Sequence, residues 1–141
     1  MLNNRKESKT FINLGVVLND KKEVLMIRRR VLEKGKDNSV LEWAFPGGRQ
    51  RLNETRQESI KRHILSESGY DIQWDRQIDL AFHPEIPVFI AYHLCSLVSP
   101  DPVAKPQESH EIAEIKWVKP EDIKKLISTT LNPKVANELG I

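Results

Sequence analysis

Two glycines and one glutamate in a short stretch of the chain are residue types that could hold a divalent cation. Gly47 and Gly48 follow an apolar run, and Glu67 lies in a charged segment that ends at a glycine. Glycines let the backbone turn tightly and bring a carbonyl oxygen close to a ligand. A loop carbonyl and a carboxylate held on a helix are hard oxygen ligands, which suit Mg²⁺ or Mn²⁺. The sequence therefore predicts a cation site between the glycine turn and the helix.

The residues around this site share the spacing of a known motif. The stretch resembles the Nudix box, G-x5-E-x7-R-E-U-x-E-E-x-G-U, in which U is an aliphatic residue. The Phe-Pro-Gly-Gly before it and the Glu-Ile-Lys-Trp-Val downstream are also similar to the family. The matching positions are Gly48, Glu54, Arg62, Ile64, Glu67 and Gly69, with Tyr70 at the last apolar position. The resemblance implies an α/β fold, a Nudix-type α/β/α sandwich with a mixed sheet, along nearly the whole chain.

The same resemblance implies an activity and a set of site residues. Nudix hydrolases cleave a nucleoside diphosphate linked to another group X, using Mg²⁺ or Mn²⁺ and a water that attacks phosphorus. Carried over here, the Gly47 carbonyl and the Glu67 carboxylate would bind metal, with Gly47 and Gly48 also close to the substrate. Arg29 lies where the family often places a phosphate-binding arginine. Alternation along its strand sends this side chain to the face opposite its two arginine neighbours.

Two of the three helix carboxylates of the motif are replaced in this chain. His63 stands in place of the acid after the arginine, and Ser66 in place of the first acid of the pair. A cluster of several ions needs negative charge, and serine offers only a neutral oxygen. One ion could still bind, because Mg²⁺ commonly uses one or two carboxylates plus water and substrate phosphates. His63 is a candidate base or softer metal ligand, with an idle position on the helix surface as the alternative.

An acid from a later loop would complete the candidate site. In the family such an acid acts as metal ligand or base, and Glu111 is the candidate here, ahead of Glu114. Glu108 and His110 are weaker candidates, and both of the favoured acids could instead face solvent. Two functions are therefore open. One is a Nudix pyrophosphohydrolase weakened by the missing acids, and the other is a catalytically impaired Nudix-fold protein that binds a nucleotide or partner in a regulatory role.

The elements that must position these residues are strands and helices in mixed order. Thr55 with Glu58 three residues later is a capping box that starts a helix, and Gly69 can end it in a left-handed conformation. The resemblance implies that an ion pair between Glu54 and Arg62 fixes the preceding loop to this helix. Strands are expected over residues 11–18, 24–29, 42–45, 72–82, 87–98 and 112–118, helices also over 120–127 and 133–139, and an exposed loop over 31–40.

Length and composition limit the class of protein. The 141 residues fit one domain, residues 1–141. The formal charge of +2, from 22 basic and 20 acidic side chains, argues against nucleic-acid binding through a large basic face. Cys95 is alone in an apolar run, which indicates a small buried hydrophobe rather than a reactive thiol. No signal peptide or membrane-spanning stretch is found, so a cytoplasmic location is expected.

The expected partner is a small molecule, a nucleotide or nucleoside diphosphate derivative. Variable loops at residues 31–41, 81–87 and 100–110 would decide which one is recognised. No membrane partner is expected, and a homodimer is the commonest assembly open to such a chain.

Overall fold

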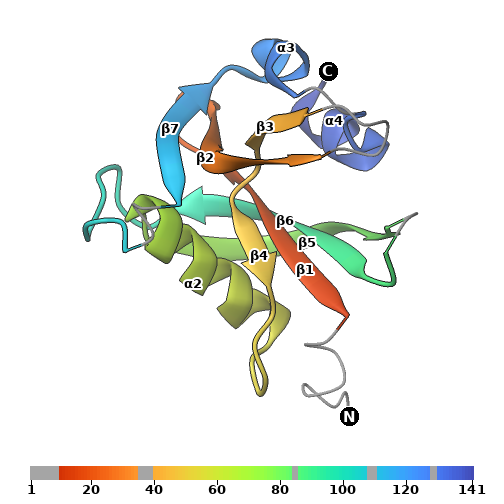
Figure 1. The fold of residues 1–141 in the computed structure, drawn as a ribbon. Helices are drawn as coiled ribbons and strands as arrows, with labels where there is room; N and C mark the ends of the chain where they lie inside the picture. The colour runs from red at the N-terminus through yellow and green to blue at the C-terminus, as the bar shows by residue number, and fades with distance from the viewer. Residues whose placement is uncertain (1–9, 35–39, 84–85, 108–110, 128–129) are drawn as a thin grey trace.

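Strands and helices follow one another largely as the sequence predicts (Figure 1). The computed structural model describes residues 10–34, 40–83, 86–107, 111–127 and 130–141. No helix in these residues is long and apolar enough to cross a membrane. The elements are β1 (Phe11–Leu18), β2 (Val24–Lys34), β3 (Val40–Ala44), β4 (Gly47–Arg49), α2 (Arg56–Ser68), β5 (Ile72–Phe82), β6 (Phe89–Leu97), β7 (Ile112–Val118), the 3-10 helix η1 (Pro120–Asp122), α3 (Ile123–Leu126) and α4 (Pro133–Leu139).

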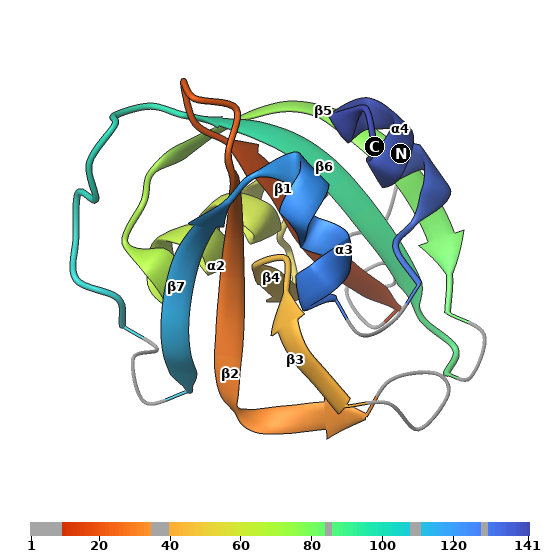
Figure 2. The same ribbon diagram turned by 90° about the horizontal axis from the view of Figure 1, so that it is seen from above.

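A mixed sheet of seven strands forms the centre of the described structure. Its order is β3-β2-β1-β6-β5, with β4 paired to β1 and β7 paired to β2. The pair β1–β6 is parallel, and the other pairs are antiparallel. Strands β1 and β2 pair at Leu18 and Val24, next to their turn. Away from the turn β1 pairs with β4 and β2 pairs with β3, while β7 pairs with β2 from Val24 to Arg29, so the sheet opens into two parts (Figure 2).

Helices cover the two faces of this sheet. Val17 of β1 belongs to a buried cluster with Ile60 and Ile64 of α2. Its neighbour Val16 belongs to a second cluster, which includes Ile123 of α3 and residues of α4. Consecutive side chains of a strand point to opposite faces, so α2 lies on one side of the sheet and α3 and α4 on the other. The predicted α/β/α sandwich with a mixed sheet is confirmed.

The helix that carries Glu67 begins and ends as predicted. The Thr55 hydroxyl accepts a hydrogen bond from the backbone N–H of Glu58 (3.1 Å), and the Glu58 carboxylate accepts one from the backbone N–H of Thr55 (3.0 Å). At the other end Gly69 has a φ of 81°, and its N–H donates to the carbonyl of Leu65. Both ends are determined by local contacts, which is why sequence spacing was sufficient to find them.

Cys95 lies inside the protein, as its apolar surroundings predict. Its side chain is 1% exposed and belongs to the cluster beneath α2. Burial, with a smaller effect from the charge of Asp75, raises the pKa of its thiol to about 12. The thiol therefore behaves as a small hydrophobe at neutral pH.

The loop predicted at residues 31–40 is wrong at both of its ends. Strand β2 continues to Lys34 and β3 begins at Val40, and these two residues pair with each other. Residues 35–39 of the predicted loop lie outside the described residues. Backbone pairing between β2 and β3 extends both strands into a segment whose polar sequence is typical of a loop.

Two other boundaries also differ from the prediction. The glycine turn was expected to end a strand, yet residues 47–49 form β4 by pairing with β1. The helix expected over residues 120–127 consists of η1 followed by the four-residue α3. The first difference reflects pairing with a distant strand, which local propensity does not report.

Candidate metal and phosphate site

The glycine turn is held against β1 by its backbone. Leu14 pairs with Gly47, Asn13 pairs with Gly48, and the N–H of Gly15 donates to the carbonyl of Pro46 (2.8 Å). Gly47 has a φ of 146°, and a Cβ atom there would lie 2.0 Å from the backbone oxygen of Asn13. A side chain cannot be accommodated at this position, because both the backbone conformation and the close approach require glycine.

Glu67 reaches this turn from α2 and is fully buried. Its Oε1 atom accepts a hydrogen bond from the backbone N–H of Gly47 at 3.0 Å, and its Oε2 lies 3.4 Å from the same nitrogen. A buried carboxylate needs donors or a counter-charge to offset lost hydration. The two residues expected to share a cation, 20 positions apart, are therefore in direct contact.

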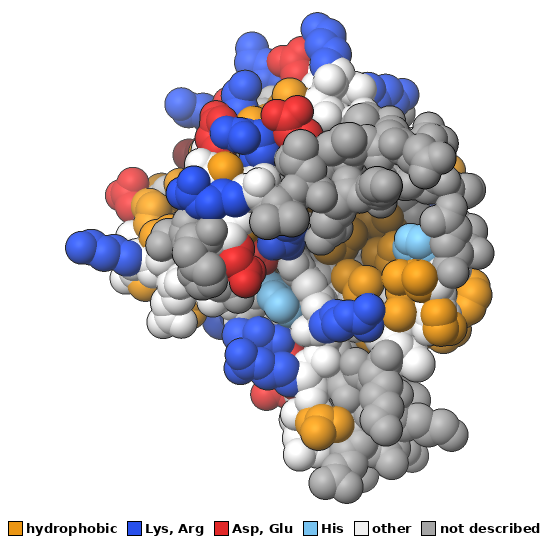
Figure 3. Space-filling model, viewed as in Figure 1, with side chains coloured by type: hydrophobic (Ala, Val, Ile, Leu, Met, Phe, Trp, Pro, Cys, Tyr) orange, Lys and Arg blue, Asp and Glu red, His pale blue; other side chains and the backbone are white. Residues whose placement is uncertain are grey.

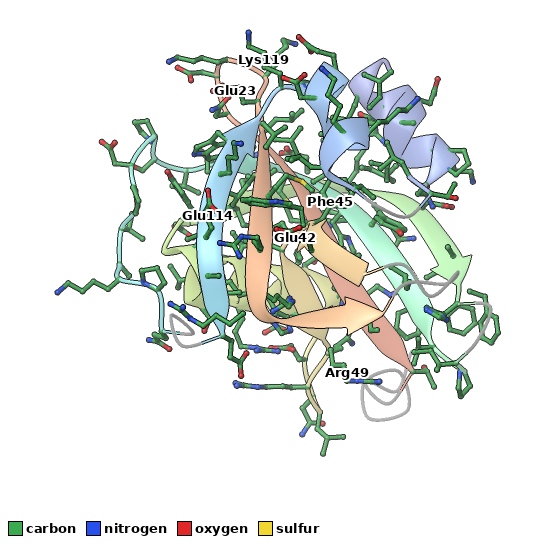
Figure 4. The ribbon with its side chains drawn as sticks, turned by 45° about the horizontal axis from the view of Figure 1, so that its top comes forward. Glu23, Glu42, Phe45, Arg49, Glu114 and Lys119 are labelled. Carbon is green, nitrogen blue, oxygen red and sulfur yellow. The ribbon has the colours of Figure 1, made fainter. Side chains whose placement is uncertain are left out.

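Arg29 supplies positive charge at the same point. Its Nη2 atom donates to the carbonyl oxygen of Gly47 (3.1 Å) and to Oε1 of Glu67 (3.5 Å). The adjacent Arg28 instead pairs with Glu114 of β7 (3.4 Å) and with Glu42 of β3 (4.0 Å). Figure 4 shows Glu114 and Glu42 on the strands that flank β2. Alternation along β2 thus sends the two neighbouring arginines to different partners, as predicted.

An ion pair fixes the loop between β4 and α2 to the helix. Arg62 contacts Glu54 through two hydrogen bonds, Nε to Oε2 at 2.6 Å and Nη2 to Oε1 at 2.9 Å. Burial alone would raise the pKa of Glu54. The pKa nevertheless lies below its ordinary value, because Arg62 and the backbone of Arg51 donate hydrogen bonds to the carboxylate. The positive charges of Arg62 and His63 lower it further. The pair joins loop to helix as the motif implies.

His63 lies against β4. A Cβ atom on Gly48 would meet the imidazole carbon Cε1 at 2.6 Å, so the missing side chain of this glycine leaves room for the ring. The Nε2 atom is 2.8 Å from the carbonyl oxygen of Arg49 and 3.3 Å from Nη2 of Arg62. A carbonyl only accepts, so Nε2 carries the hydrogen in this contact. The ring is thereby held by the strand that follows the glycine turn.

The proline-rich loop after β6 is attached to the C-terminal end of α2. The carbonyl of Ser66 accepts a hydrogen bond from the backbone N–H of Gln107 (2.8 Å), and that of Gly69 accepts one from Val103 (2.9 Å). A Cβ atom on Gly69 would lie 2.1 Å from the carbonyl oxygen of Ala104. The loop therefore begins its path toward β7 from a fixed position beside the helix.

Glu111 arrives near Arg29 at the end of this loop. Its carbonyl oxygen accepts a hydrogen bond from the backbone N–H of Arg30 (2.9 Å), and the residue is exposed. Glu114, the alternative, pairs with Arg28. The weaker candidates, Glu108 and His110, lie outside the described residues. The backbone at Glu111 therefore lies beside the part of β2 that carries Arg29.

A buried polar chain behind the site was not found from the sequence. The indole N–H of Trp74 donates to Nδ1 of His93 (3.0 Å), whose Nε2–H donates to Oδ1 of Asn13 (2.9 Å). The Asn13 amide donates to Gln50 (2.9 Å), and the Gln50 amide donates to the carbonyl of Glu54 (2.8 Å). These bonds connect β5, β6 and β1 to the loop that carries the ion pair. In the sequence, the only indication of this chain was that two polar residues, Asn13 and His93, lie within apolar runs that were expected to be strands.

Burial determines the charge of His93. The residue is 1% exposed, and burial, followed by the positive charge of Arg56, lowers its pKa to about 4. The ring is therefore neutral at physiological pH, with Nε2 carrying the hydrogen because Nδ1 accepts from Trp74. A second proton on Nδ1 would point at the indole N–H, which is also a donor, so the hydrogen bond from Trp74 would be lost.

Apolar side chains are exposed where β5 and β6 meet, in one of the predicted recognition loops. Phe82 is 61% exposed and contacts Phe89 edge-on, with ring centroids 5.1 Å apart. Phe89 in turn stacks on Phe11 of β1 at 5.3 Å. Figure 3 shows apolar side chains gathered on one side of the visible face, with Lys and Arg interspersed with Asp and Glu on the other. This face carries no large patch of basic charge among its described residues.

The glycine turn brings together two oxygen atoms of the kind that hard cations prefer. The Gly47 carbonyl and the Glu67 carboxylate both lie within 3.5 Å of one guanidinium nitrogen. Within the described part of the chain, no three His, Cys, Asp or Glu side chains are arranged to hold a metal ion. Two protein oxygens, completed by water and substrate phosphates, are an accepted environment for Mg²⁺.

A known domain family and several solved structures are similar to this chain. The model of the NUDIX domain family matches residues 10–138. A protein of Bacillus subtilis (strain 168), provisionally named an 8-oxo-dGTP diphosphatase, is 28% identical over 105 residues, which are 74% of this chain and 63% of the relative. The matched region thus spans less than two thirds of that protein.

Solved structures share the fold at low sequence identity. A Caenorhabditis elegans Ap4A hydrolase has a TM-score of 0.65 at 20% identity, covering 92% of this chain and 92% of its own. An ADP-ribose pyrophosphatase from Streptococcus suis 89-1591 has a TM-score of 0.62 at 16% identity, covering 92% of this chain and 87% of its own. These likenesses support the architecture rather than a substrate.

Proposed function

The chain belongs to the NUDIX domain family, and from this membership we propose that it is a pyrophosphohydrolase that cleaves a nucleoside diphosphate derivative with one Mg²⁺ or Mn²⁺ ion. The observation that carries the proposal is the convergence of the Gly47 carbonyl and the buried Glu67 carboxylate on a single cationic nitrogen. Both are oxygen ligands of the kind that hard cations prefer.

The proposed metal ligands are Gly47 and Glu67, with Glu111 as the late-loop acid. When bound, such an ion would act as a Lewis acid that polarises phosphoryl oxygens and lowers the pKa of a water molecule. The backbone N–H of Gly47 orients the Glu67 carboxylate, and the ion pair between Arg62 and Glu54 fixes the loop that follows the turn. These contacts keep the oxygen ligands in place before substrate arrives.

The chain also offers groups for the phosphates and for proton transfer. The Arg29 guanidinium is proposed to bind a substrate phosphate, because its planar fork suits bidentate contact. Gly48 is proposed to contact the substrate through its backbone, because the His63 ring fills the space where its side chain would lie. Glu111 or His63 is proposed as the base, with His63 held beside Gly48 by the carbonyl of Arg49. A base must come within hydrogen-bond reach of the attacking water.

Hydrolysis of a small panel tests the proposal. The panel contains 8-oxo-dGTP, ADP-ribose and Ap4A, each titrated with Mg²⁺ and Mn²⁺ while nucleotide or phosphate release is measured. We expect metal-dependent cleavage of at least one member. Glu67→Gln should lower kcat by about 100-fold or more, and Glu121→Gln, an exposed acid of η1, should leave it unchanged. Activity that survives Glu67→Gln would show that the ligand assignment is wrong.

A nucleotide-binding protein without efficient hydrolysis is the second candidate. The observation that favours it is the loss of two helix acids at His63 and Ser66, with Glu67 already satisfied by Gly47 and Arg29. If no panel member is cleaved while one binds with micromolar affinity, the enzyme proposal fails and this function replaces it. Ser66→Glu provides a complementary measurement, since a restored acid should raise metal affinity at an otherwise assembled site.

A further inference from the structure

The Arg29 guanidinium lies where the proposed metal ion would have to bind. Its Nη2 nitrogen is 3.1 Å from the Gly47 carbonyl oxygen and 3.5 Å from Oε1 of Glu67, the two atoms proposed as metal ligands. Building on the proposed function, we infer that Arg29 is an internal cation that competes with the divalent ion. The metal then binds only when this side chain leaves the site.

Charge balance explains why a guanidinium is stable at this position. Glu67 is fully buried, and a buried carboxylate is costly unless it is paired and hydrogen-bonded. With serine at position 66 and histidine at position 63, neither of these helix positions contributes an anion. One arginine neutralises one glutamate, so the pair carries no net charge. Additional carboxylates at the two positions would leave negative charge that a single arginine could not balance.

The position of Arg29 also allows it to leave. Its side chain is 24% exposed, whereas that of Glu67 is 1% exposed. The arginine thus reaches the buried carboxylate from the edge of the site. A substrate phosphate offers the guanidinium a bidentate partner. Transfer of Arg29 from Glu67 to a phosphate would free both oxygen ligands, so phosphate and metal should promote each other's binding.

Mn²⁺ affinity without nucleotide tests the competition directly. We would measure it by the electron paramagnetic resonance signal of the free aquo ion, for the wild-type protein and for Arg29→Met. Removing the competing charge should tighten Mn²⁺ binding by about tenfold or more. The double variant Arg29→Met with Glu67→Gln should lose this tight binding, which would locate the gain at the Glu67 carboxylate.

Arg28→Met is the matched control. It removes the same charge from the adjacent position of β2, but Arg28 pairs with Glu114 and Glu42 instead of Glu67. Its Mn²⁺ affinity should stay within about twofold of the wild type, because more distant exposed charges are screened. Equal affinities for wild type and Arg29→Met would overturn the inference. An equal gain in Arg28→Met would also overturn it, because the effect would then be one of net charge.

Thermal unfolding gives a second readout that does not depend on activity. Without metal, Arg29→Met should melt below the wild type, because the buried Glu67 carboxylate loses its counter-charge. Mn²⁺ should then raise the melting temperature of the variant more than that of the wild type. If Arg29→Met does not fold, Arg29→Gln replaces it, because an amide can still donate to the Gly47 carbonyl without charge.

The outcomes separate this inference from the proposed function. Tighter Mn²⁺ binding by Arg29→Met without hydrolysis of any panel member would support the competition and contradict the enzyme proposal. Metal-dependent hydrolysis with identical Mn²⁺ affinities in wild type and variant would support the enzyme and contradict the competition.

Discussion

The buried histidine of β6 should make the stability of this protein depend on pH between about 6.5 and about 4. In the folded state burial lowers the pKa of His93 from 6.5 to about 4. The unfolded chain has no such burial, so its histidine titrates near the ordinary value. A difference of about 2.5 pH units at about 1.36 kcal/mol each corresponds to about 3 kcal/mol of folding free energy.

The sign follows from which state binds the proton. Between the two pKa values the unfolded chain is protonated at His93 and the folded protein is not, so lowering the pH favours unfolding. The contribution is fully present above the unfolded pKa and is lost as pH falls toward the folded pKa. From about pH 7.5 to about pH 4.5 we expect a loss of about 2.5 kcal/mol.

Urea unfolding across this pH range is the assay. The pKa of Glu54 lies below its ordinary value of 4.5, and that of Asp79 lies below 3.8. The stability that these two carboxylates contribute is therefore lost at more acidic pH than that of His93. His93→Gln removes the titrating ring while keeping an amide that can donate to Asn13. We expect the variant to lose the slope between about pH 6.5 and pH 4.5. A wild-type protein with constant stability over this range, or a variant that keeps the slope, would refute the reasoning.

Three further predictions concern residues that hold the site in place. Gly47→Ala should lower the free energy of unfolding by about 3 kcal/mol or more, because of backbone strain and the clash with β1. Gly140→Ala is the control, because a Cβ atom there meets nothing within 4 Å. It should lower the free energy of unfolding by less in the same denaturant titration. Arg62→Met should lower the free energy of unfolding by about 1–3 kcal/mol, since Glu54 loses its ion pair with Arg62. The variant should also make the loop before α2 more sensitive to protease. Unchanged digestion would contradict this role. Ile64→Ala, at a fully buried position of α2, should cost about 2–5 kcal/mol by calorimetry; a cost below about 1 kcal/mol would argue against its place in the core.

Local patterns in the sequence predicted the elements that local contacts form. The capping box at Thr55 and the glycine at Gly69 define α2 through hydrogen bonds within a few residues. The ion pair between Glu54 and Arg62 was also expected, because the resemblance to the Nudix motif implies it, and the structure contains it. Such contacts depend on the identity and separation of nearby residues, which a sequence displays directly.

Other features depend on pairing between distant segments. The extension of β2 and the formation of β4 come from partners in β3 and β1. The chain of hydrogen bonds through His93 joins residues up to 80 positions apart. The pattern of residues within one segment does not predict such contacts, because they form only when distant segments come together in the folded protein.

The candidate site combines both kinds of information. The sequence, through its resemblance to the Nudix motif, indicated the groups available: a carbonyl at Gly47, a carboxylate at Glu67 and a cation at Arg29. Only the tertiary structure placed the guanidinium between the two oxygens, since β2, β4 and α2 meet through long-range strand pairing and helix packing. Packing therefore supplies positive charge from the protein itself at this point, because it brings the Arg29 side chain within reach of a buried carboxylate.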